Sequence, residues 1–247
     1  MSSHTAQPSA AMLVIGDEIL SGRTRDANMH HLAQELTKHG IALCEVRMVA
    51  DVRAEIVAAV RALSERWDTV FTSGGIGPTH DDITADAIAE AFGAEIGVRE
   101  DARTRLQAHY DAQGIELNAA RLRMARVPQG ADLIDNPISA APGFRMGNVH
   151  VMAGVPSVFQ AMVASVLPTL TGGPPMLSQS LDVPRGEGDI AAPLAELALR
   201  YAELSVGCYP TYRNGAYGAT VVIRGTDPSR LDAAMAELAG LFPEALR

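Results

Sequence analysis

The sequence predicts an α/β protein, in which a parallel sheet carries helices on both faces as a three-layer domain, followed by a small α+β module. Two observations lead to this prediction. Apolar runs of strand length alternate with amphipathic helical stretches over most of the chain, which is typical of βαβ units. A proline- and glycine-rich stretch at 168–176 then interrupts the pattern, and a different order of elements follows. We therefore expect one domain over 11–170 and a second over 177–247.

The first elements are a strand, a helix and a second strand. Residues 1–10 are small and polar and predict a flexible tail, and the apolar run 11–15 predicts a buried strand ending at Gly16. Asp26 can cap a helix that Gly40 ends, and a strand follows over 41–49. The predicted buried stripe of this helix is Met29, Leu32, Ala33 and Leu36.

The middle of the chain continues the alternation. A helix burying Val52, Ile56, Val60 and Leu63 precedes a strand at 69–72, and another helix begins near Asp82. The segment 99–126 is predicted as arginine-rich helices with a solvated face. Short strands are expected between 144 and 151, and Pro156 can occupy the first position of a helix that buries Phe159, Met162, Val163 and Val166.

The segment after the break predicts a βαββα module. Strands are expected at 178–183, 204–210 and 217–224, with a turn at Asn214 and Gly215. Helices are expected between the first two strands and after the last one.

Composition excludes several classes of function. The 247 residues hold 20 basic and 29 acidic side chains, a net charge of −9, and only 4% aromatic residues. This balance disfavours a nucleic-acid partner and a membrane surface. Two cysteines in no ligand-like spacing predict inert buried thiols rather than a disulfide framework, and a cytoplasmic protein.

The strongest candidate site is the glycine-rich stretch 74–84, which lies where a strand ends and a helix begins. Glycines let backbone N–H groups approach an anion, and the start of a helix favours negative charge. The stretch lacks the ending of a phosphate-binding P-loop and the spacing of a dinucleotide fingerprint. Asp81 and Asp82 would repel a phosphate unless a divalent cation lay between them. The alternative is that Asp82 or Thr84 merely caps the helix.

A second acidic turn, residues 16–22, follows the first strand. Ligands of open α/β sheets bind beyond the carboxyl ends of strands, so Asp17 and Glu18 are expected to face the same crevice as Asp82 and to share a metal with it. An ordinary acidic turn is the alternative. A third set of turns comprises 136–137, 141–144 and 154–157, of which Gly154 and Pro156 mark another strand-to-helix turn with free N–H groups. The alternative is that these residues only mark loops.

These stretches together resemble the MoaB/Mog molybdopterin-binding fold, specifically its CinA-type (competence/damage-inducible protein A) branch. The matching residues are 16–22, 26–28, 74–84, 141–144 and 154–156, with Ala27 in place of the usual threonine. The resemblance covers about residues 11–170 and continues weakly into the second domain. It implies that Asp82, with Asp81, is catalytic. The residues it implies for ligand and phosphate binding are Gly74, Gly75, Gly77, Thr79, Thr84, Ser21, Asn28, Pro142, Gly143, Gly154 and Pro156.

Three functions are compatible with this pattern. The first is a divalent-metal-dependent pyrophosphatase (Mg²⁺, Mn²⁺ or Co²⁺) acting on a nucleotide diphosphate such as ADP-ribose or FAD, with Asp17, Glu18 and Asp82 as metal ligands. The second is a molybdopterin-binding protein of molybdenum-cofactor biosynthesis, and the third is a non-catalytic nucleotide-binding module. The resemblance also implies a homo-oligomer.

Overall fold

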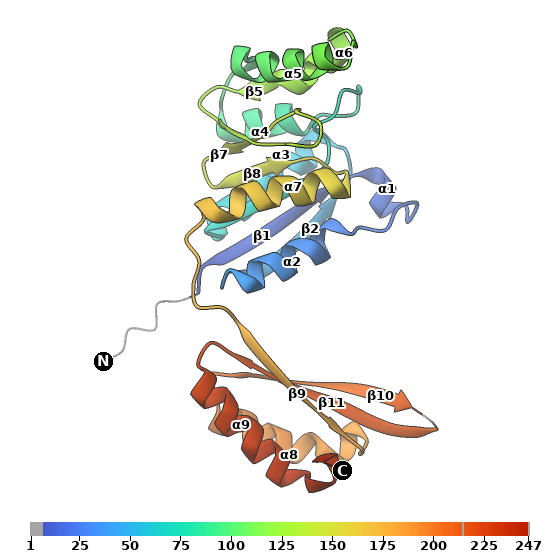
Figure 1. Cartoon of the computed structure of the whole chain (residues 1–247), viewed down its shortest axis with the longest axis vertical. Coiled ribbons are helices and arrows are strands. Elements are labelled where there is room, and N and C mark those ends of the chain that lie inside the picture. The colour runs from blue at the N-terminus through green and yellow to red at the C-terminus, as the bar shows by residue number, and fades with distance from the viewer. Residues whose placement is uncertain (1–6, 214, 247) are drawn as a thin grey trace, which may run out of the picture. The chain divides into compact units, whose positions relative to one another are not determined.

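The computed structural model describes residues 7–213 and 215–246, and the chain divides into two compact units at Gly173 and Pro174 (Figure 1). The first unit is built on a six-stranded sheet in the order β2-β1-β3-β8-β7-β6. Its strands are β1 (Ser9–Ile15), β2 (Ala42–Val49), β3 (Thr69–Ser73), β6 (Asp132–Ile134), β7 (Gly143–Met146) and β8 (Val149–Met152).

The sheet is parallel over β2, β1, β3 and β8, and β7 and β6 extend it as antiparallel strands. The predicted parallel α/β sheet is thus confirmed for its centre. Beyond β8, the sheet continues with the antiparallel strands β7 and β6. The two-residue turn between β7 and β8 is too short for the crossover that a parallel connection needs. Residues Ser9 and Ala10 belong to β1, so the predicted tail is wrong at 9–10; residues 1–6 lie outside the described part.

Helices cover both faces of the sheet (Figure 1). Alternate residues of β1 explain this: Ala11, Leu13 and Ile15 join one apolar cluster, and Ala10, Met12 and Val14 join the other. The first cluster includes buried residues of α3 (Arg53–Arg66), α4 (Thr84–Phe92) and α5 (Glu100–Ala112). The second includes those of α2 (Asn28–Lys38) and α7 (Pro156–Val166).

The local signals of these helices act largely as predicted. Asp26 Oδ1 accepts hydrogen bonds from the N–H groups of Asn28 and Met29 at 3.0 and 3.2 Å, and Gly40 adopts a φ of 67° just beyond α2. Pro156 is the first residue of α7. Two details differ: Val52 is exposed because it precedes α3, and α4 begins at Thr84 rather than near Asp82.

Several short elements lie outside the predicted alternation. They are α1 (Asp17–Leu20), β4 (Ile96–Val98), α6 (Ala119–Leu122), η1 (Arg123–Ala125), β5 (Arg126–Pro128) and η2 (Leu167–Thr169). Strands β4 and β5 pair as a separate antiparallel ribbon. Elements of three or four residues leave too little periodicity to be found from sequence.

The second unit is the predicted βαββα module. Its elements are β9 (Leu177–Val183), α8 (Glu187–Arg200), β10 (Ser205–Arg213), β11 (Ala216–Gly225), α9 (Pro228–Leu241) and η3 (Pro243–Leu246). The sheet order is β10-β11-β9, antiparallel throughout, and α8 and α9 bury their apolar stripes in one cluster with it. The turn predicted at Asn214 falls outside the described residues.

Two further predictions concern exposure. Cys208 in the second unit is half-buried, but Cys44 on the edge strand β2 is exposed, so the prediction of two buried thiols is wrong for Cys44. An edge strand has a neighbouring strand on one side only, and an apolar sequence alone does not reveal that position. In the described ranges, no helix combines the length and apolarity that crossing a bilayer requires.

Candidate functional site

The candidate site is a pocket of about 580 Å³ beyond the carboxyl ends of β1, β3 and β8. Three turns form its floor: Gly16 after β1, residues 74–78 after β3, and residues 153–156 after β8. The order of the sheet reverses between β1 and β3, which is where open α/β sheets bind ligands. The predicted convergence of these turns is therefore present in the structure.

Glycine is required at the centre of this floor. Gly74 has a φ of 111°, and a Cβ there would collide with the carbonyl oxygen of Ile15 at the end of β1. A Cβ on Gly154 would lie 3.2 Å from the Gly74 Cα. The turns after β1, β3 and β8 are thus packed backbone against backbone, which leaves no room for side chains between them.

The turn from Gly75 into α4 is tied to its own helix. The Thr84 N–H donates to the Gly75 carbonyl at 3.0 Å, and the buried Thr84 hydroxyl occupies the space that a side chain on Gly75 would need. Thr84 therefore supports the loop from beneath and does not line the pocket. The N–H groups of Gly75, Gly77 and Gly154 donate to no acceptor within the described ranges.

Asp82 is oriented by Thr79. The Thr79 N–H and hydroxyl donate to Asp82 Oδ2 at 2.8 and 2.6 Å, and a Cβ on Gly77 would lie only 2.6 Å from the same oxygen. Thr79 itself is exposed and does not line the pocket. Its contribution to the site is to fix the carboxylate of Asp82.

Four carboxylate residues line the pocket: Glu18, Asp51, Asp81 and Asp82. Asp17, predicted as a metal ligand, does not line it; its N–H instead donates to Asp51 Oδ2 at 3.0 Å. Burial raises the pKa of Asp51, and repulsion from Asp17, Glu18 and Asp81 raises it further. Among the described residues, no three carboxylate, histidine or cysteine side chains are close enough to enclose a metal ion.

The remaining predicted residues differ in their roles. Buried Asn28 donates from Nδ2 to Ser73 Oγ at 2.7 Å and to the Gly154 carbonyl at 2.8 Å, which ties α2 to the turns after β3 and β8. Gly154 and Pro156 line the pocket, whereas Ser21 is exposed outside it. Gly143 lies inside β7, and Pro142 lines a smaller neighbouring cavity.

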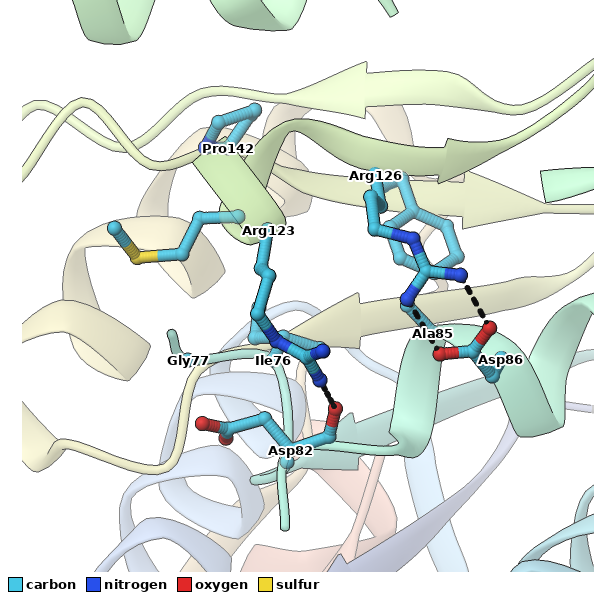
Figure 2. A pocket seen from close by; sticks show the side chains of 11 residues that line it. Ile76, Gly77, Asp82, Ala85, Asp86, Arg123, Arg126 and Pro142 are labelled. Carbon is cyan, nitrogen blue, oxygen red and sulfur yellow. Dashed lines mark hydrogen bonds and ion pairs between the residues drawn. The ribbon is translucent and has the colours of Figure 1, made fainter. Parts of the chain in front are cut away.

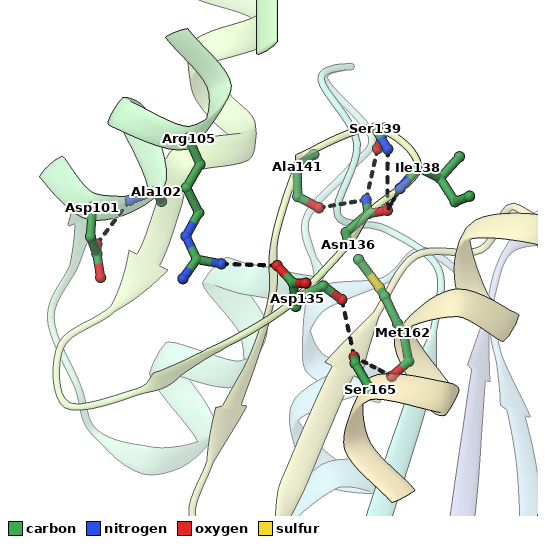
Figure 3. Close-up of polar contacts among 10 residues, drawn as sticks. All are labelled: Asp101, Ala102, Arg105, Asp135, Asn136, Ile138, Ser139, Ala141, Met162 and Ser165. Atoms are coloured by element: carbon green, nitrogen blue, oxygen red, sulfur yellow. Dashed lines mark hydrogen bonds and ion pairs between the residues drawn. The ribbon is translucent and has the colours of Figure 1, made fainter. Parts of the chain in front are cut away.

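Asn136 shapes the loop that forms another wall of the pocket (Figure 3). Its Nδ2 donates to Ser139 Oγ and to the Ala141 carbonyl at 2.7 and 2.8 Å, and its Oδ1 accepts from the N–H groups of Ile138 and Ser139 at 3.0 and 3.2 Å. This buried side chain thus satisfies the backbone of a tight loop. The alternative interpretation, that Asn136 only marks a loop, agrees with these bonds.

Two residues of the site were not predicted. Asp51 lies two residues beyond the end of β2, so the strand-end rule that selected Asp17 and Asp82 could have found it. Arg123 approaches the glycine-rich turn from η1, and its Nη2 donates to the Asp82 carbonyl at 3.4 Å (Figure 2). No sequence signal separates Arg123 from the other arginines of 99–126.

Known proteins with this architecture define a class. A family model described as "Probable molybdopterin binding domain" matches residues 11–172, and one described as "FAD synthase, middle domain" matches residues 175–246. The first match places the sheet and its pocket in the MoaB/Mog class of α/β domains.

Individual relatives narrow this class. A CinA-like protein of Myxococcus xanthus is 35% identical over 79% of this chain and 50% of its own length. A probable FAD synthase of Caenorhabditis briggsae is 29% identical over 91% of this chain and 47% of its own length. The crystal structure of CinA from Thermoplasma acidophilum, titled as of unknown function, matches with 33% identity and a TM-score of 0.60, over 65% of this chain and 98% of its own.

The chain belongs to the MoaB/Mog family of molybdopterin-binding-type domains and is CinA-like within it. It spans about half the length of the CinA-like and FAD synthase relatives.

Proposed function

We propose that the chain is a divalent-metal-dependent pyrophosphatase that acts on a nucleotide diphosphate of the ADP-ribose or FAD class. The observation that supports this most directly is that free glycine N–H groups and four carboxylate residues line one pocket. A pocket of about 580 Å³ is within the range of small-molecule sites.

The glycine turns supply the anion-binding part of the proposal. The N–H groups of Gly75, Gly77 and Gly154 have no acceptor in the described chain, and the three residues line the pocket. Unpaired N–H groups at a strand-to-helix turn favour phosphate oxygens. We therefore assign them to the diphosphate.

The donor types in the pocket fit a hard divalent cation. Glu18, Asp51, Asp81 and Asp82 offer carboxylate oxygens, which Mg²⁺ and Mn²⁺ prefer. Mg²⁺ in phosphoryl sites commonly takes only one or two carboxylates and completes its shell with phosphate oxygens and water. This requirement is compatible with a pocket in which no three of the described carboxylates are close enough to bind one ion. Such an ion would supply charge stabilisation on the phosphate oxygens.

In the proposed reaction, one water oxygen forms a bond to a phosphorus atom and the bridging P–O bond breaks. From ADP-ribose, this yields AMP and ribose 5-phosphate, with the released protons passing to solvent. Asp82, fixed by Thr79, would orient the attacking water. Asn28 holds the turns that present the diphosphate.

The test measures AMP release from ADP-ribose and from FAD with Mg²⁺, Mn²⁺ or Co²⁺. We expect Asp82→Ala to lower the rate by about 100-fold or more. Asp232→Ala, an exposed carboxylate of α9, is the matched control and should retain the wild-type rate. Equal rates for wild type and Asp82→Ala would remove the proposal.

The family model over 11–172 favours a second candidate, molybdopterin binding in cofactor assembly. Binding of molybdopterin at micromolar concentration, together with no AMP release from ADP-ribose or FAD, would favour this candidate. Tight binding of ADP-ribose without turnover under every metal would instead favour the non-catalytic nucleotide module. Assembly into a homo-oligomer and a cytoplasmic location are further proposals, which light scattering and cell fractionation address.

A further inference from the structure

A small cavity adjoins the main pocket at the glycine-rich turn (Figure 2). It measures about 20 Å³, enough for one water-sized atom. It shares Gly75, Ile76, Gly77, Asp82 and Met124 with the main pocket. A ligand bound against this turn can therefore occupy the main pocket and place one small atom in the smaller cavity.

Arg123 lines this cavity with an incompletely paired guanidinium. Its Nε is buried and has no hydrogen-bond partner, and its Nη2 has only the long 3.4 Å bond to the Asp82 carbonyl. Throughout 7–213 and 215–246, no carboxylate oxygen lies within 4.0 Å of this guanidinium. A partly buried cation without an anion is costly, so the site favours a negatively charged oxygen.

Arg126, three residues along, differs from Arg123 in being fully paired. Arg126 Nη1 and Nη2 donate to the two oxygens of Asp86 at 2.8 and 2.6 Å (Figure 2). Asp86 lines the same cavity, but its oxygens both face Arg126. The Asp86 carboxylate of α4 is therefore already neutralised by Arg126.

We propose that Arg123 is a phosphate-binding residue, and that the small cavity takes one non-bridging oxygen of a diphosphate held against Gly75 and Gly77. An oxygen there would supply the missing negative charge beside the guanidinium. The inference rests on the proposed function only in taking the ligand to be a diphosphate. Arg123 thus determines specificity for charge at this turn and has no role in bond breaking.

The test is calorimetric titration of the full chain with inorganic pyrophosphate, in EDTA and again with Mg²⁺. We expect Arg123→Gln to weaken binding by about 10- to 100-fold. Arg123→Lys, which keeps the charge but lacks the Nε donor, should weaken it by a smaller factor. Arg121→Gln is the matched control, because Arg121 lies on the neighbouring α6 over the Tyr110 ring and lines neither cavity.

The outcomes separate this inference from the proposed function. Unchanged pyrophosphate affinity in both Arg123 variants, or no pyrophosphate binding by wild type, overturns the inference even if wild type cleaves ADP-ribose. Weakened binding in the Arg123 variants supports it even if wild type cleaves nothing. If circular dichroism shows that Arg123→Gln does not fold, the test is the pyrophosphate affinity of Arg123→Lys. An affinity equal to that of wild type would then overturn the inference.

Discussion

The two units of the chain bury different kinds of side chain. The second unit has a wholly apolar core in its described part, built from residues such as Leu197, Val221 and Phe242. Between residues 7 and 173, the first unit buries six polar residues: Asn28, Thr72, Ser73, Thr84, Asn136 and His150. Buried polar groups need partners and close backbone fits, so they cost stability unless a fixed geometry is required. The difference places the precisely fixed geometry of this chain in the first unit, where Asn28, Ser73, Thr84 and Asn136 lie at the turns of the candidate site.

The comparison predicts that the glycine floor is the most sensitive point of the first unit. Gly74→Ala adds a Cβ at a φ of 111° and against the Ile15 carbonyl, so we expect a loss of about 4 kcal/mol in the free energy of unfolding. Denaturant titration followed by the fluorescence of Trp67, the one tryptophan, reports this unit. Gly130→Ala, at a φ of 83° with open space around it, should cost about 1 kcal/mol. Equal losses would contradict the packing explanation.

The pH dependence of stability should also differ between the units. All seven histidines precede the second unit, and the last is His150, which stacks on Phe71. Burial, and secondarily Arg145, lowers the pKa of His150 from 6.5 to about 4. As pH falls below 6.5 the unfolded chain takes up a proton that the folded chain accepts only near pH 4. Stability is therefore complete above pH 6.5 and falls by about 3 kcal/mol on reaching pH 4.

The measurement compares wild type with His150→Phe by denaturant titration at pH 7 and pH 5. Wild type should lose about 2 kcal/mol more than the variant between these two values. Carboxylates that titrate in the same range act on both proteins and cancel in the difference. Parallel losses in the two proteins would show that His150 is not kept neutral by its surroundings.

Asn28→Ala tests whether buried polar bonds hold the site turns together. It removes two donated bonds and leaves Ser73 Oγ and the Gly154 carbonyl without them, so we expect a loss of about 2 kcal/mol. Gln179→Ala in the second unit removes one exposed bond to Asp232 and should cost under about 0.5 kcal/mol. The comparison fails if both substitutions have the same effect.

The smallest effect concerns two ion pairs, one in each unit. Asp86→Asn weakens a partly buried pair with Arg126 and should cost about 1 to 2 kcal/mol. Glu203→Gln weakens the more exposed pair with Arg230, which water screens, and should cost less than Asp86→Asn. Thermal unfolding by circular dichroism measures both, and a larger shift for Glu203→Gln would reverse the expected order.

The sequence predicts the main elements because their signals are local. Apolar stripes, the Asp26 cap, Gly40 and Pro156 all act within a few residues, and each has the expected role. The antiparallel direction of β7 was harder to predict from the sequence, since it depends on a two-residue turn to β8 that is too short for a crossover. The second module follows the predicted order throughout its described part.

The site was predicted where a strand-end rule applies and missed where spatial proximity alone decides. Gly74, Glu18 and Asp82 follow strands and meet in the pocket. Glu18 lines the pocket and Asp17 does not, because one residue along the short helix α1 changes the direction of a side chain. Arg123 lines the small cavity beside the pocket and comes from a segment predicted as a solvated helix, and only the folded chain distinguishes it from Arg121.

The two cysteines, one in each unit, allow chemical labelling of the natural sequence. Cys44 is exposed, whereas Cys208 is half-buried, and burial raises its pKa. The thiolate is the reactive form, so a limiting amount of maleimide dye should attach to Cys44 first, and a second dye added later to Cys208. A donor and an acceptor fluorophore could thus be installed in order, and energy transfer between them would follow the separation of the units as ligand is added.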